Sequence, residues 1–315
     1  NALLERRGAR TLLLTNRGLG DVLEIGTQAR PELFDLEIRK PSPLHERAVE
    51  LPGRIGLGGG EPEPLDEAMA REVLAGALGD GFHSVAIVGI HSDADPTLEM
   101  RLVEIAREVG LPYAVASSEI AREMGMLARG ETATTDAYLT PLLQAHVRAL
   151  ETALPGARLA FMQSSGGLTD AGRFRGPGAL LSGPAGGVVG AARVAAEAGY
   201  GSAVGFDMGG TSTDVSLIEG GECERAFETT LAGVRVKAPM LCIHSVAAGG
   251  GSLCRFDGFR LTVGPESAGA DPGPLCYGRA GAPADSVPPG RSSAQPRDGG
   301  ASEGLALTDV NLFLG

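Results

Sequence analysis

Side chains capable of chemistry and glycines are concentrated in one stretch of the chain, VGFDMGGTSTDVSLIEGG at residues 204–221. An apolar run ends there on a carboxylate, two adjacent glycines follow, and three hydroxyl side chains precede a second carboxylate. Adjacent glycines allow a tight turn whose amides converge on an anion, so we predict a phosphate-binding turn. The residues predicted to contact phosphate are Gly209, Gly210, Thr211, Ser212 and Thr213, and those predicted to be catalytic are Asp207 and Asp214.

The residues after the turn indicate the class of phosphate site. Val215 and Leu217 alternate with Ser216, which predicts a returning strand. Loops of the Walker-A and Rossmann types lead from a strand into a helix instead. A glycine turn between two strands resembles the phosphate loop of the actin, hexokinase and heat-shock ATPase group, so ATP is the expected ligand. Because a bare carboxylate would repel ATP, Asp207 is expected to hold Mg²⁺ through water.

A glycine-rich hairpin with exposed hydroxyls and no ligand is the simpler interpretation of this stretch, because short motifs occur by chance. The apolar runs on both sides of the turn and the second carboxylate, Asp214, favour the phosphate site. We therefore expect ATP and Mg²⁺ as cofactors.

Three further glycine-rich segments are candidates for the same site. SGPAGG (182–187) is expected to open a helix whose free amides attract an anion, although close helix packing explains its small residues equally well. AAGGGS (247–252) follows a predicted strand, MLCIHSV (240–246), and GPESAGADPGPLCYG (264–278) is expected to be an Ω-like loop. The candidate nucleotide contacts in the first two segments are Gly183, Gly186, Gly187, Gly249, Gly250, Gly251 and Ser252.

Other catalytic signatures are missing from the sequence. No H-x-x-x-H or H-E-x-x-H spacing exists, which argues against a zinc enzyme, and no G-x-S-x-G elbow exists. His91 ends an apolar run, a common site position in parallel sheets. The 4 cysteines form no C-x-x-C pair, so free thiols in a reducing, cytoplasmic compartment are expected.

Hydrophobic periodicity predicts alternating helices and strands, which is α/β organisation. Strands are expected at 10–14, 84–90, 112–117, 157–163 and 202–206. Helices are expected at 64–78, from Asp95 onward and at 134–154, the last bent or restarted at Pro141. Residues 180–199 are expected to form a short strand, a glycine turn and a helix.

Composition excludes several classes of partner. An apolar fraction of 43% with 21% charged residues is typical of a globular protein. A net charge of −12 and an aromatic content of 4% argue against nucleic acid binding. The most apolar run, 178–196, is interrupted by Pro184 and Arg193, so no membrane span is expected.

Seven segments in order along the chain resemble the hydantoinase A/5-oxoprolinase family, and three runs, IGTQAR, RGETATTDAYLTP and FETTLAGVRVKAPML, are most similar to its 5-oxoprolinase branch. The seven segments are LLERRGAR (3–10), IGTQARPELFDL (25–36), RGETATTDAYLTP (129–141), LLSGPAGGVVG (180–190), FDMGGTSTDVS (206–216), VAAGGGS (246–252) and VGPESAGADPGPLCYG (263–278).

The resemblance implies an actin-like ATPase (ribonuclease H-like) fold with mixed sheets flanked by helices. It also implies ATP-dependent hydrolysis of a small cyclic amide, 5-oxoproline to glutamate, with Mg²⁺. The hydrolytic half-reaction would belong to a B-type subunit or fused domain, in an oligomeric assembly. In that scheme Asp207 and Asp214 organise the metal and water.

The resemblance also divides the chain. It implies a preceding D-x-G-G-T loop and a later Gly-Gly-Ala-Gly-Pro loop, so this chain is expected to hold half of an ATP site. The run HSDADPTLE (91–99) departs from the family pattern, which puts a role for His91 in doubt. The expected regions are 1–60 (end of an N-terminal region), 61–200 (α/β), 201–279 (phosphate-binding), 280–304 (a flexible Pro/Gly/Ser-rich loop) and 305–315 (start of the next segment).

Two alternatives remain open from the sequence. The same machinery could act on hydantoins or activate a ketone for carboxylation. Alternatively, the chain could be a non-catalytic nucleotide-binding scaffold, because fold alone does not fix function.

Overall fold

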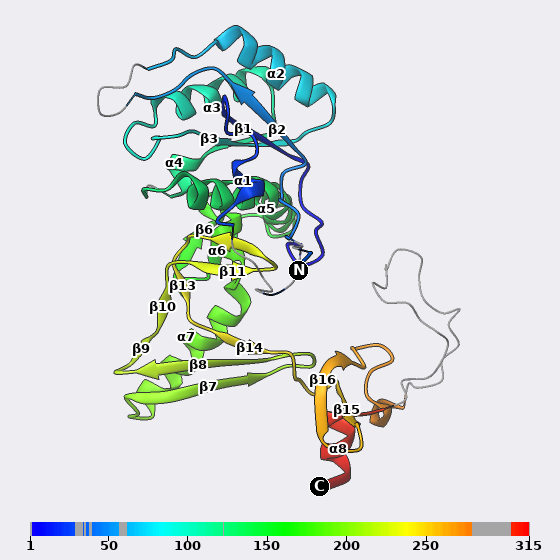
Figure 1. The fold of residues 1–315 in the computed structure, drawn as a ribbon. Coiled ribbons are helices and arrows are strands. Elements are labelled where there is room, and N and C mark those ends of the chain that lie inside the picture. The colour runs from blue at the N-terminus through cyan, green and yellow to red at the C-terminus, as the bar shows by residue number, and fades with distance from the viewer. Residues whose placement is uncertain are drawn as a thin grey trace. The chain divides into compact units, whose positions relative to one another are not determined.

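The computed structural model describes residues 2–28, 34, 36–37, 40–56, 62–121, 123–278 and 304–314 (Figure 1). The predicted loop 280–304 therefore lies outside the described residues, except for Gly304. The chain forms two compact units, residues 1–186 with 225–241 and residues 187–224 with 242–315.

A parallel sheet organises the first unit, with strand order β2-β1-β3-β4. Its strands are β1 (Thr11–Asn16), β2 (Arg47–Leu51), β3 (Ser84–Val88) and β4 (Tyr113–Ala116). Every residue of β1 and β3 is buried, as expected of central strands covered on both faces. The strands predicted at 10–14, 84–90 and 112–117 are confirmed.

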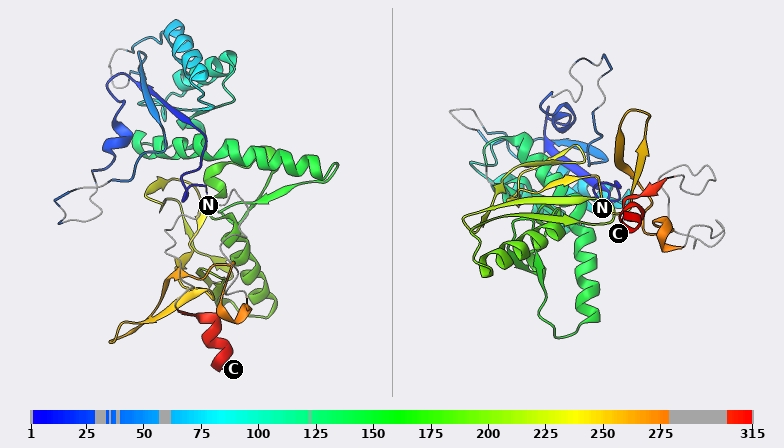
Figure 2. Two further views of the ribbon diagram at one scale, coloured as in Figure 1. Left: turned by 90° about the vertical axis from the view of Figure 1, so that its right-hand side faces the viewer. Right: turned by 90° about the horizontal axis from the view of Figure 1, so that it is seen from below.

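Helices cover both faces of this sheet (Figure 2). Leu12 and Leu14 of β1 pack against α2 (Glu67–Gly79) and α3 (Thr97–Val109), whereas Leu13 packs toward α5 (Met126–Ala153). This alternation follows from the two-residue period of a strand. Both predicted helices on the first face are confirmed, and Asp66 caps α2 by accepting a hydrogen bond from Met69 N at 3.0 Å.

Helix α5 begins eight residues before the predicted Thr134 and continues through Pro141. Its first half is buried all round, so it lacks the polar face on which the prediction depended. The buried threonines bond to carbonyls one turn earlier, as in Thr132 Oγ1 to Ala128 O at 2.8 Å and Thr134 Oγ1 to Gly130 O at 2.7 Å. These bonds satisfy polar groups that would otherwise be costly to bury.

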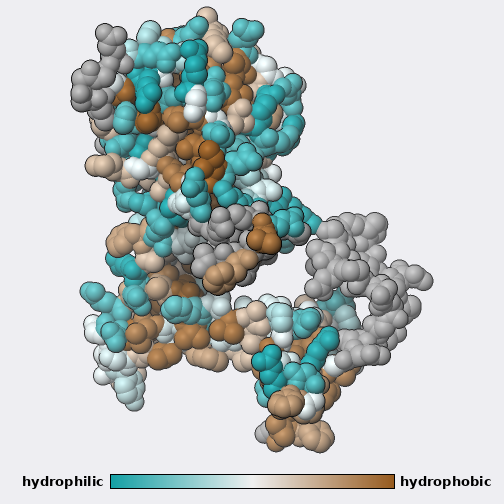
Figure 3. All heavy atoms as spheres, in the orientation of Figure 1, coloured by the Kyte–Doolittle hydropathy of each residue, from teal (hydrophilic) through white to brown (hydrophobic). Residues whose placement is uncertain are grey.

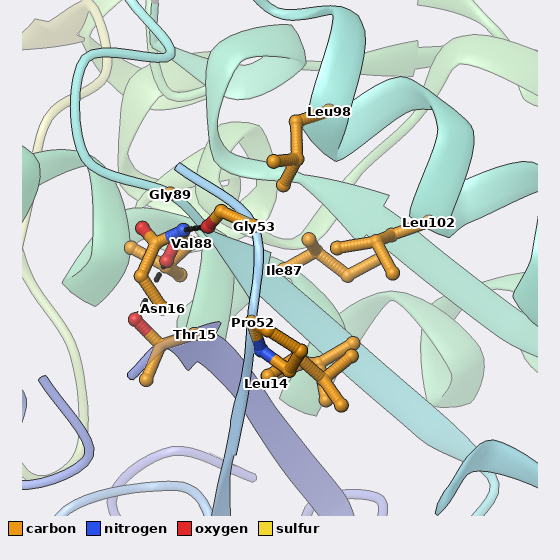
Figure 4. Close-up of a pocket in the computed structure, with 11 residues that line it drawn as sticks. Leu14, Thr15, Asn16, Pro52, Gly53, Ile87, Val88, Gly89, Leu98 and Leu102 are labelled. Carbon is orange, nitrogen blue, oxygen red and sulfur yellow. Dashed lines mark hydrogen bonds between the residues drawn. The ribbon is translucent and has the colours of Figure 1, made fainter. Parts of the chain in front are cut away.

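The carboxyl ends of β1 and β3 are closed by side-chain hydrogen bonds (Figure 4). Asn16 donates to Gly53 O and accepts from Ile90 N at 2.7 Å, and Thr15 donates to Val88 O at 2.8 Å. The remaining cavity is about 10 Å³, which holds no substrate. Ligands of open parallel sheets usually bind at this edge. Because hydrogen bonds close the edge in this sheet, we infer that the sheet supports other elements.

An ionic network lies beside this edge. The carboxylate of Glu99, which is 0% exposed, accepts hydrogen bonds from Gly89 N, Ser117 Oγ, Ser118 N and Ser118 Oγ at 2.6–2.9 Å. The fully buried Arg129 donates to Gly89 O at 3.0 Å, to Asp93 at 3.0 Å and to Ser117 Oγ at 3.3 Å. The network fastens the segments after β3 and β4 to α3 and α5.

Short elements complete the first unit. They are α1 (Val22–Ile25), α4 (Ser117–Ile120), β5 (Ala160–Met162), β6 (Leu168–Asp170), η1 (Ala171–Arg173), α6 (Gly176–Ala179), β10 (Arg225–Ala226), β11 (Thr229–Leu231), β12 (Val234–Val236) and β13 (Met240–Leu241). The strand predicted at 157–163 corresponds to the shorter β5.

Two predictions of local structure are wrong. The short strand and glycine turn expected within 180–199 are absent, because Ser182 to Glu197 form one helix, α7, although SGPAGG opens that helix as predicted. The strand predicted at 240–246 is divided into β13 and β14 (His244–Val246), which belong to different units and different sheets. Apolar runs of this length do not distinguish a continuous strand from two short ones.

The second unit is built on an antiparallel hairpin. Strands β7 (Ser202–Met208) and β8 (Thr213–Glu219) pair throughout, and β14 and β9 (Glu222–Cys223) extend the sheet. A second sheet contains β15 (Ser252–Phe256), β16 (Leu261–Ser267) and β17 (Leu305–Ala306). Along the chain, η2 (Leu275–Tyr277) comes after β16, and α8 (Leu307–Leu314) comes directly after β17. Apolar side chains stay exposed on the hairpin, including Phe206 at 67% (Figure 3).

Among the helices that the structure describes, none combines the length and the apolar character that a bilayer span requires. The longest, α5, carries charged residues along its length.

We expect Glu99→Gln to lower the stability of the first unit by about 2–3 kcal/mol, because an amide cannot accept all the hydrogen bonds of the carboxylate and leaves buried donors unpaired. Hydrogen exchange of β3 and β4 peptides measures this loss. The control is Glu104→Gln on the same helix, where an exposed carboxylate contacts Arg101 and a change below about 1 kcal/mol is expected. Equal protection in both variants would show that the network does not fasten the sheet.

Candidate nucleotide-phosphate site

The two aspartates of the predicted motif lie directly opposite each other. Asp207 near the end of β7 pairs with Asp214 near the start of β8, so both side chains leave the same face of the hairpin. A Cβ at Gly205, on that face, would lie 3.7 Å from the side chain of Ala191, so the face is the one that α7 covers. Ser245 of β14 donates a hydrogen bond to the Asp214 carboxylate. The predicted hairpin is confirmed, and its register brings the two carboxylates together.

The turn between the two strands exposes backbone amides. Gly209 N donates to Ser212 O at 2.9 Å and closes the turn. Among the residues that the structure describes, the amides of Gly210, Thr211 and Ser212 have no acceptor. Consecutive unpaired amides at a glycine turn form an anion-binding concavity.

A second glycine turn packs against the first, backbone to backbone. Gly250 N donates to Gly209 O at 2.9 Å, and Gly251 N donates to Gly210 O. A Cβ at Gly249 would lie 2.7 Å from backbone atoms of the hairpin turn, including Thr211 N. Only glycine permits this approach. The bonds orient the hairpin carbonyls toward residues 249–251, which leaves the hairpin amides facing away from that contact.

Two hydroxyls of the predicted site have backbone partners. Thr213, 5% exposed, donates to Ala248 O at 2.5 Å, and the fully buried Ser252 accepts from Gly249 N at 2.8 Å. Both bonds shape the glycine turns. A direct contact of these hydroxyls with phosphate stays a prediction.

The glycines of SGPAGG lie at the start of α7. Gly187 belongs to the second unit, and a Cβ there would lie 3.4 Å from Asp207 Oδ2, so this side of the helix adjoins the carboxylate. Gly183 and Gly186 belong to the first unit. Their role in nucleotide binding stays a prediction.

A cavity of about 520 Å³ adjoins the two glycine turns. Its lining includes Met208, Gly209, Gly210, Thr211, Gly250, Gly251, Gly269, Ala270, Pro274, Tyr277 and Thr308. The volume falls within the range of small-molecule sites. The amides of Gly209, Gly250 and Gly251 in this wall already donate to backbone carbonyls, whereas those of Gly210 and Thr211 have no acceptor among the described residues and could donate to a ligand.

Sequence reasoning missed Thr308 and Asp309. Thr308 donates through both its amide, at 2.8 Å, and its hydroxyl, at 2.6 Å, to Gly250 O. The carboxylate of Asp309 accepts from Cys276 N at 2.7 Å, Ala306 N at 2.8 Å and Leu275 N at 3.2 Å. Thr308 and Asp309 therefore join the loop 264–278, called here the cavity loop because it contributes to the cavity wall, to the glycine turn at 249–251. Its signal was a Thr-Asp dipeptide at the start of a helix, a common capping pattern.

The charge of Asp309 depends on these bonds. Burial raises the pKa of its carboxyl, but the amides of Cys276 and Ala306 outweigh burial and leave the pKa lowered. A lowered carboxyl pKa contributes stability that is present at neutral pH and is lost as pH falls through the folded-state value.

The two carboxylates of the hairpin fit Mg²⁺, which keeps several of its waters, better than a metal that is held by three or more protein side chains. Among the described residues, no group of three or more His, Cys, Asp or Glu could hold a metal ion. Mg²⁺ keeps several waters and is usually held by one or two carboxylates together with phosphates. Asp207 and Asp214 match that pattern.

We expect Gly249→Ala to destabilise the second unit by about 1–3 kcal/mol, because the added methyl would overlap the hairpin backbone. Gly190→Ala in α7 is the matched control, since nothing lies within 4 Å of a Cβ there, and alanine in a helix is neutral or stabilising. Hydrogen exchange of peptides from β7 and β8 gives both values. Equal effects would contradict the packed contact between the turns.

We expect Asp309→Asn to increase hydrogen exchange of the loop 264–278 at pH 7, because one carboxylate oxygen is lost as an acceptor. As the pH falls below the ordinary carboxyl range of about 4, the unmodified chain should approach the variant. A loop that exchanges equally in both chains at pH 7 would show that Asp309 does not hold it.

Known proteins with similar sequences match the whole chain. Residues 1–110 match the Hydantoinase/oxoprolinase N-terminal region, and residues 129–286 match Hydantoinase/oxoprolinase. The chain is 39% identical to 5-oxoprolinase 1 of Arabidopsis thaliana and 37% identical to the 5-oxoprolinase of Saccharomyces cerevisiae, over 100% of its own length. It spans 25% of the length of each of these relatives.

Solved structures match in fold as well. The ATP-dependent caprolactamase from Pseudomonas jessenii has a TM-score of 0.76 and 30% identity, over 100% of this chain and 44% of that one. The nucleotide-free acetone carboxylase has a TM-score of 0.70 and 25% identity, over 85% of this chain and 41% of that one. The expected α/β fold of the actin-like ATPase type is confirmed, and the chain belongs to the hydantoinase/oxoprolinase family.

Proposed function

We propose that the chain provides the phosphate-binding hairpin of an ATP-dependent cyclic amide hydrolase whose substrate is 5-oxoproline. The observation that carries the proposal is the hairpin turn itself. Its amides at residues 210–212 have no acceptor within the described part of the chain, a cavity of about 520 Å³ adjoins it, and Asp207 lies opposite Asp214. The similarity to 5-oxoprolinases supports the substrate. Because the chain spans a quarter of those relatives, the activity is assigned to the whole protein.

Phosphoryl transfer explains why such a reaction uses ATP. A lactam carbonyl is a poor electrophile because amide resonance donates electron density to it. In the proposed step, the lactam oxygen bonds to the γ-phosphorus, the bond from that phosphorus to the β–γ bridging oxygen breaks, and ADP leaves. Water then adds to the activated carbon and the ring C–N bond breaks, which gives an acyl phosphate of glutamate. A second water hydrolyses that acyl phosphate and releases glutamate and phosphate.

The geometry of the hairpin supports a role for each of its residues. The amides of Gly210, Thr211 and Ser212 would bind phosphate oxygens, where fixed donors stabilise developing charge at little reorganisation cost. Asp207 and Asp214 would hold Mg²⁺ through its waters, and the metal would neutralise phosphate charge. Ser245 would fix the orientation of Asp214 through its hydrogen bond.

The hydrolytic half-reaction is assigned to a B-type subunit or fused domain. The name "Caprolactamase subunit alpha" of a relative 33% identical over 89% of this chain supports a second component in the family. The same proposal holds that the complete protein is soluble and cytoplasmic and that it forms an assembly with this second component.

The deciding experiment measures ATP hydrolysis by the complete protein with its B-type component, with and without 5-oxoproline. Stimulation with one glutamate formed per ADP is expected. Stimulation of ATP hydrolysis by hydantoin or a ketone instead would change the assigned substrate and retain the mechanism of activation by ATP. Tight ATP binding without stimulation by any of these compounds would contradict the proposal and favour a nucleotide-binding scaffold.

We expect Asp207→Asn to lower kcat for ATP hydrolysis at least about a hundredfold, because a metal held by carboxylates supplies several kcal/mol of transition-state stabilisation. Glu222→Gln is the control, since this exposed carboxylate lies in β9 of the same sheet and outside the site. Full activity of the Asp207 variant would remove the carboxylate from the mechanism.

A further inference from the structure

The first unit contains a cavity of about 330 Å³ that none of the predicted site residues lines. Its charged and polar lining residues are Glu119, Gln163, Ser165, Arg173, Arg175 and Lys237. Three of these side chains are cationic and one is anionic, in a chain with a net charge of −12. Grouped cationic side chains can bind an anion where their donors are not already used by the protein.

The cations have donors that the protein does not use. Arg175 lies 3.9 Å from the Asp136 carboxylate, beyond hydrogen-bond distance, and the two oxygens of Asp136 already accept from Tyr113 at 2.5 Å and Thr140 at 2.7 Å. Within the described parts of the chain, Arg173 has neither a hydrogen-bond nor an ion-pair partner. A guanidinium carries five N–H donors, so both arginines can bind a further acceptor.

Lys237 and Gln163 add to this set. The Lys237 ammonium contacts Glu123 at 2.5 Å, which uses one of its three donors. Among the described residues, the half-buried Gln163 side chain has no hydrogen-bond partner, and its amide offers donors and an acceptor together. The lactam group has the complementary pair, one N–H and one C=O.

The cavity wall is held by bonds between segments. Ser164, which is 0% exposed, donates to Gly178 O at 2.9 Å and accepts from Leu181 N at 2.9 Å, and its carbonyl accepts from Leu241 N at 2.7 Å. The rings of Phe161 and Phe174 stack with their centroids 4.9 Å apart, and this contact fastens the segment that contains Arg173 and Arg175 to β5. A preformed wall lowers the entropic cost of binding.

We propose that this cavity binds the carboxylate of a small lactam acid, with Arg173 and Arg175 as the anion-binding side chains and Gln163 facing the lactam amide; this inference rests on the proposed function. A guanidinium binds a carboxylate through two parallel hydrogen bonds. 5-Oxoproline carries a carboxylate on its lactam ring, whereas 2-pyrrolidinone is the same ring without it. The volume, at the low end of small-molecule sites, suits a ligand of this size.

The test measures binding to the complete protein by calorimetry without ATP, so that no turnover is needed. The probes are 5-oxoproline, 2-pyrrolidinone and inorganic phosphate. We expect 5-oxoproline to bind at least tenfold more tightly than either of the others. Arg173→Gln combined with Arg175→Gln should weaken 5-oxoproline at least tenfold and leave 2-pyrrolidinone unchanged. Arg148→Gln, an exposed arginine on α5, is the matched control and should change nothing.

Equal affinity for the two lactams, tighter binding of phosphate, or an unchanged double variant would each overturn the site. Arg175→Lys separates recognition from folding, because it keeps the charge and should restore part of the affinity only if the arginine binds the ligand. Arginine-dependent binding without stimulated ATP hydrolysis would refute the proposed function and retain the site. Normal turnover with an unchanged KM for 5-oxoproline in the double variant would refute the site and retain the proposed function.

Discussion

The backbone contact between two glycine turns is the constraint on which the candidate phosphate site depends. Gly250 and Gly251 donate to the carbonyls of Gly209 and Gly210, and the distance at Gly249 leaves no room for a side chain. Because a trans peptide directs its carbonyl and its N–H to opposite sides, the Gly210 and Thr211 amides point away from this contact, and neither has an acceptor among the described residues. Close approach of two backbones therefore explains the glycines at 249 and 251, where a Cβ would lie 2.7 Å and 2.9 Å from hairpin backbone atoms.

The remaining elements of the second unit hold this contact in position. Antiparallel pairing of β7 and β8 brings Asp207 opposite Asp214, and the bond from Thr213 to Ala248 joins the hairpin to the second turn. Thr308 and Asp309 then connect that turn to the cavity loop. In the first unit, buried polar bonds at Glu99 and Asn16 close the sheet edge and leave a cavity of only about 10 Å³ there.

The sequence predicted the elements whose signals are local. The hairpin followed from strand alternation around two glycines. Helix α2 followed from helical spacing, and α3 followed from helical spacing and from Asp95-Pro96 at its start. The first turns of α5 were missed because they are buried on every side. The helix α7 was predicted, but SGPAGG was also given a separate glycine turn because it has the composition of a turn. The roles of Thr308 and the arginine-lined cavity could not be predicted, since their partners come from segments far apart in the chain.

The most direct test of the central claim is hydrogen exchange of the complete protein with and without Mg²⁺ and a non-hydrolysable ATP analogue. If the hairpin amides bind phosphate, the peptide that spans Asp207–Asp214 will be protected several-fold when the analogue is bound. Protection elsewhere, with this peptide unchanged, would show that nucleotide phosphates do not bind the hairpin.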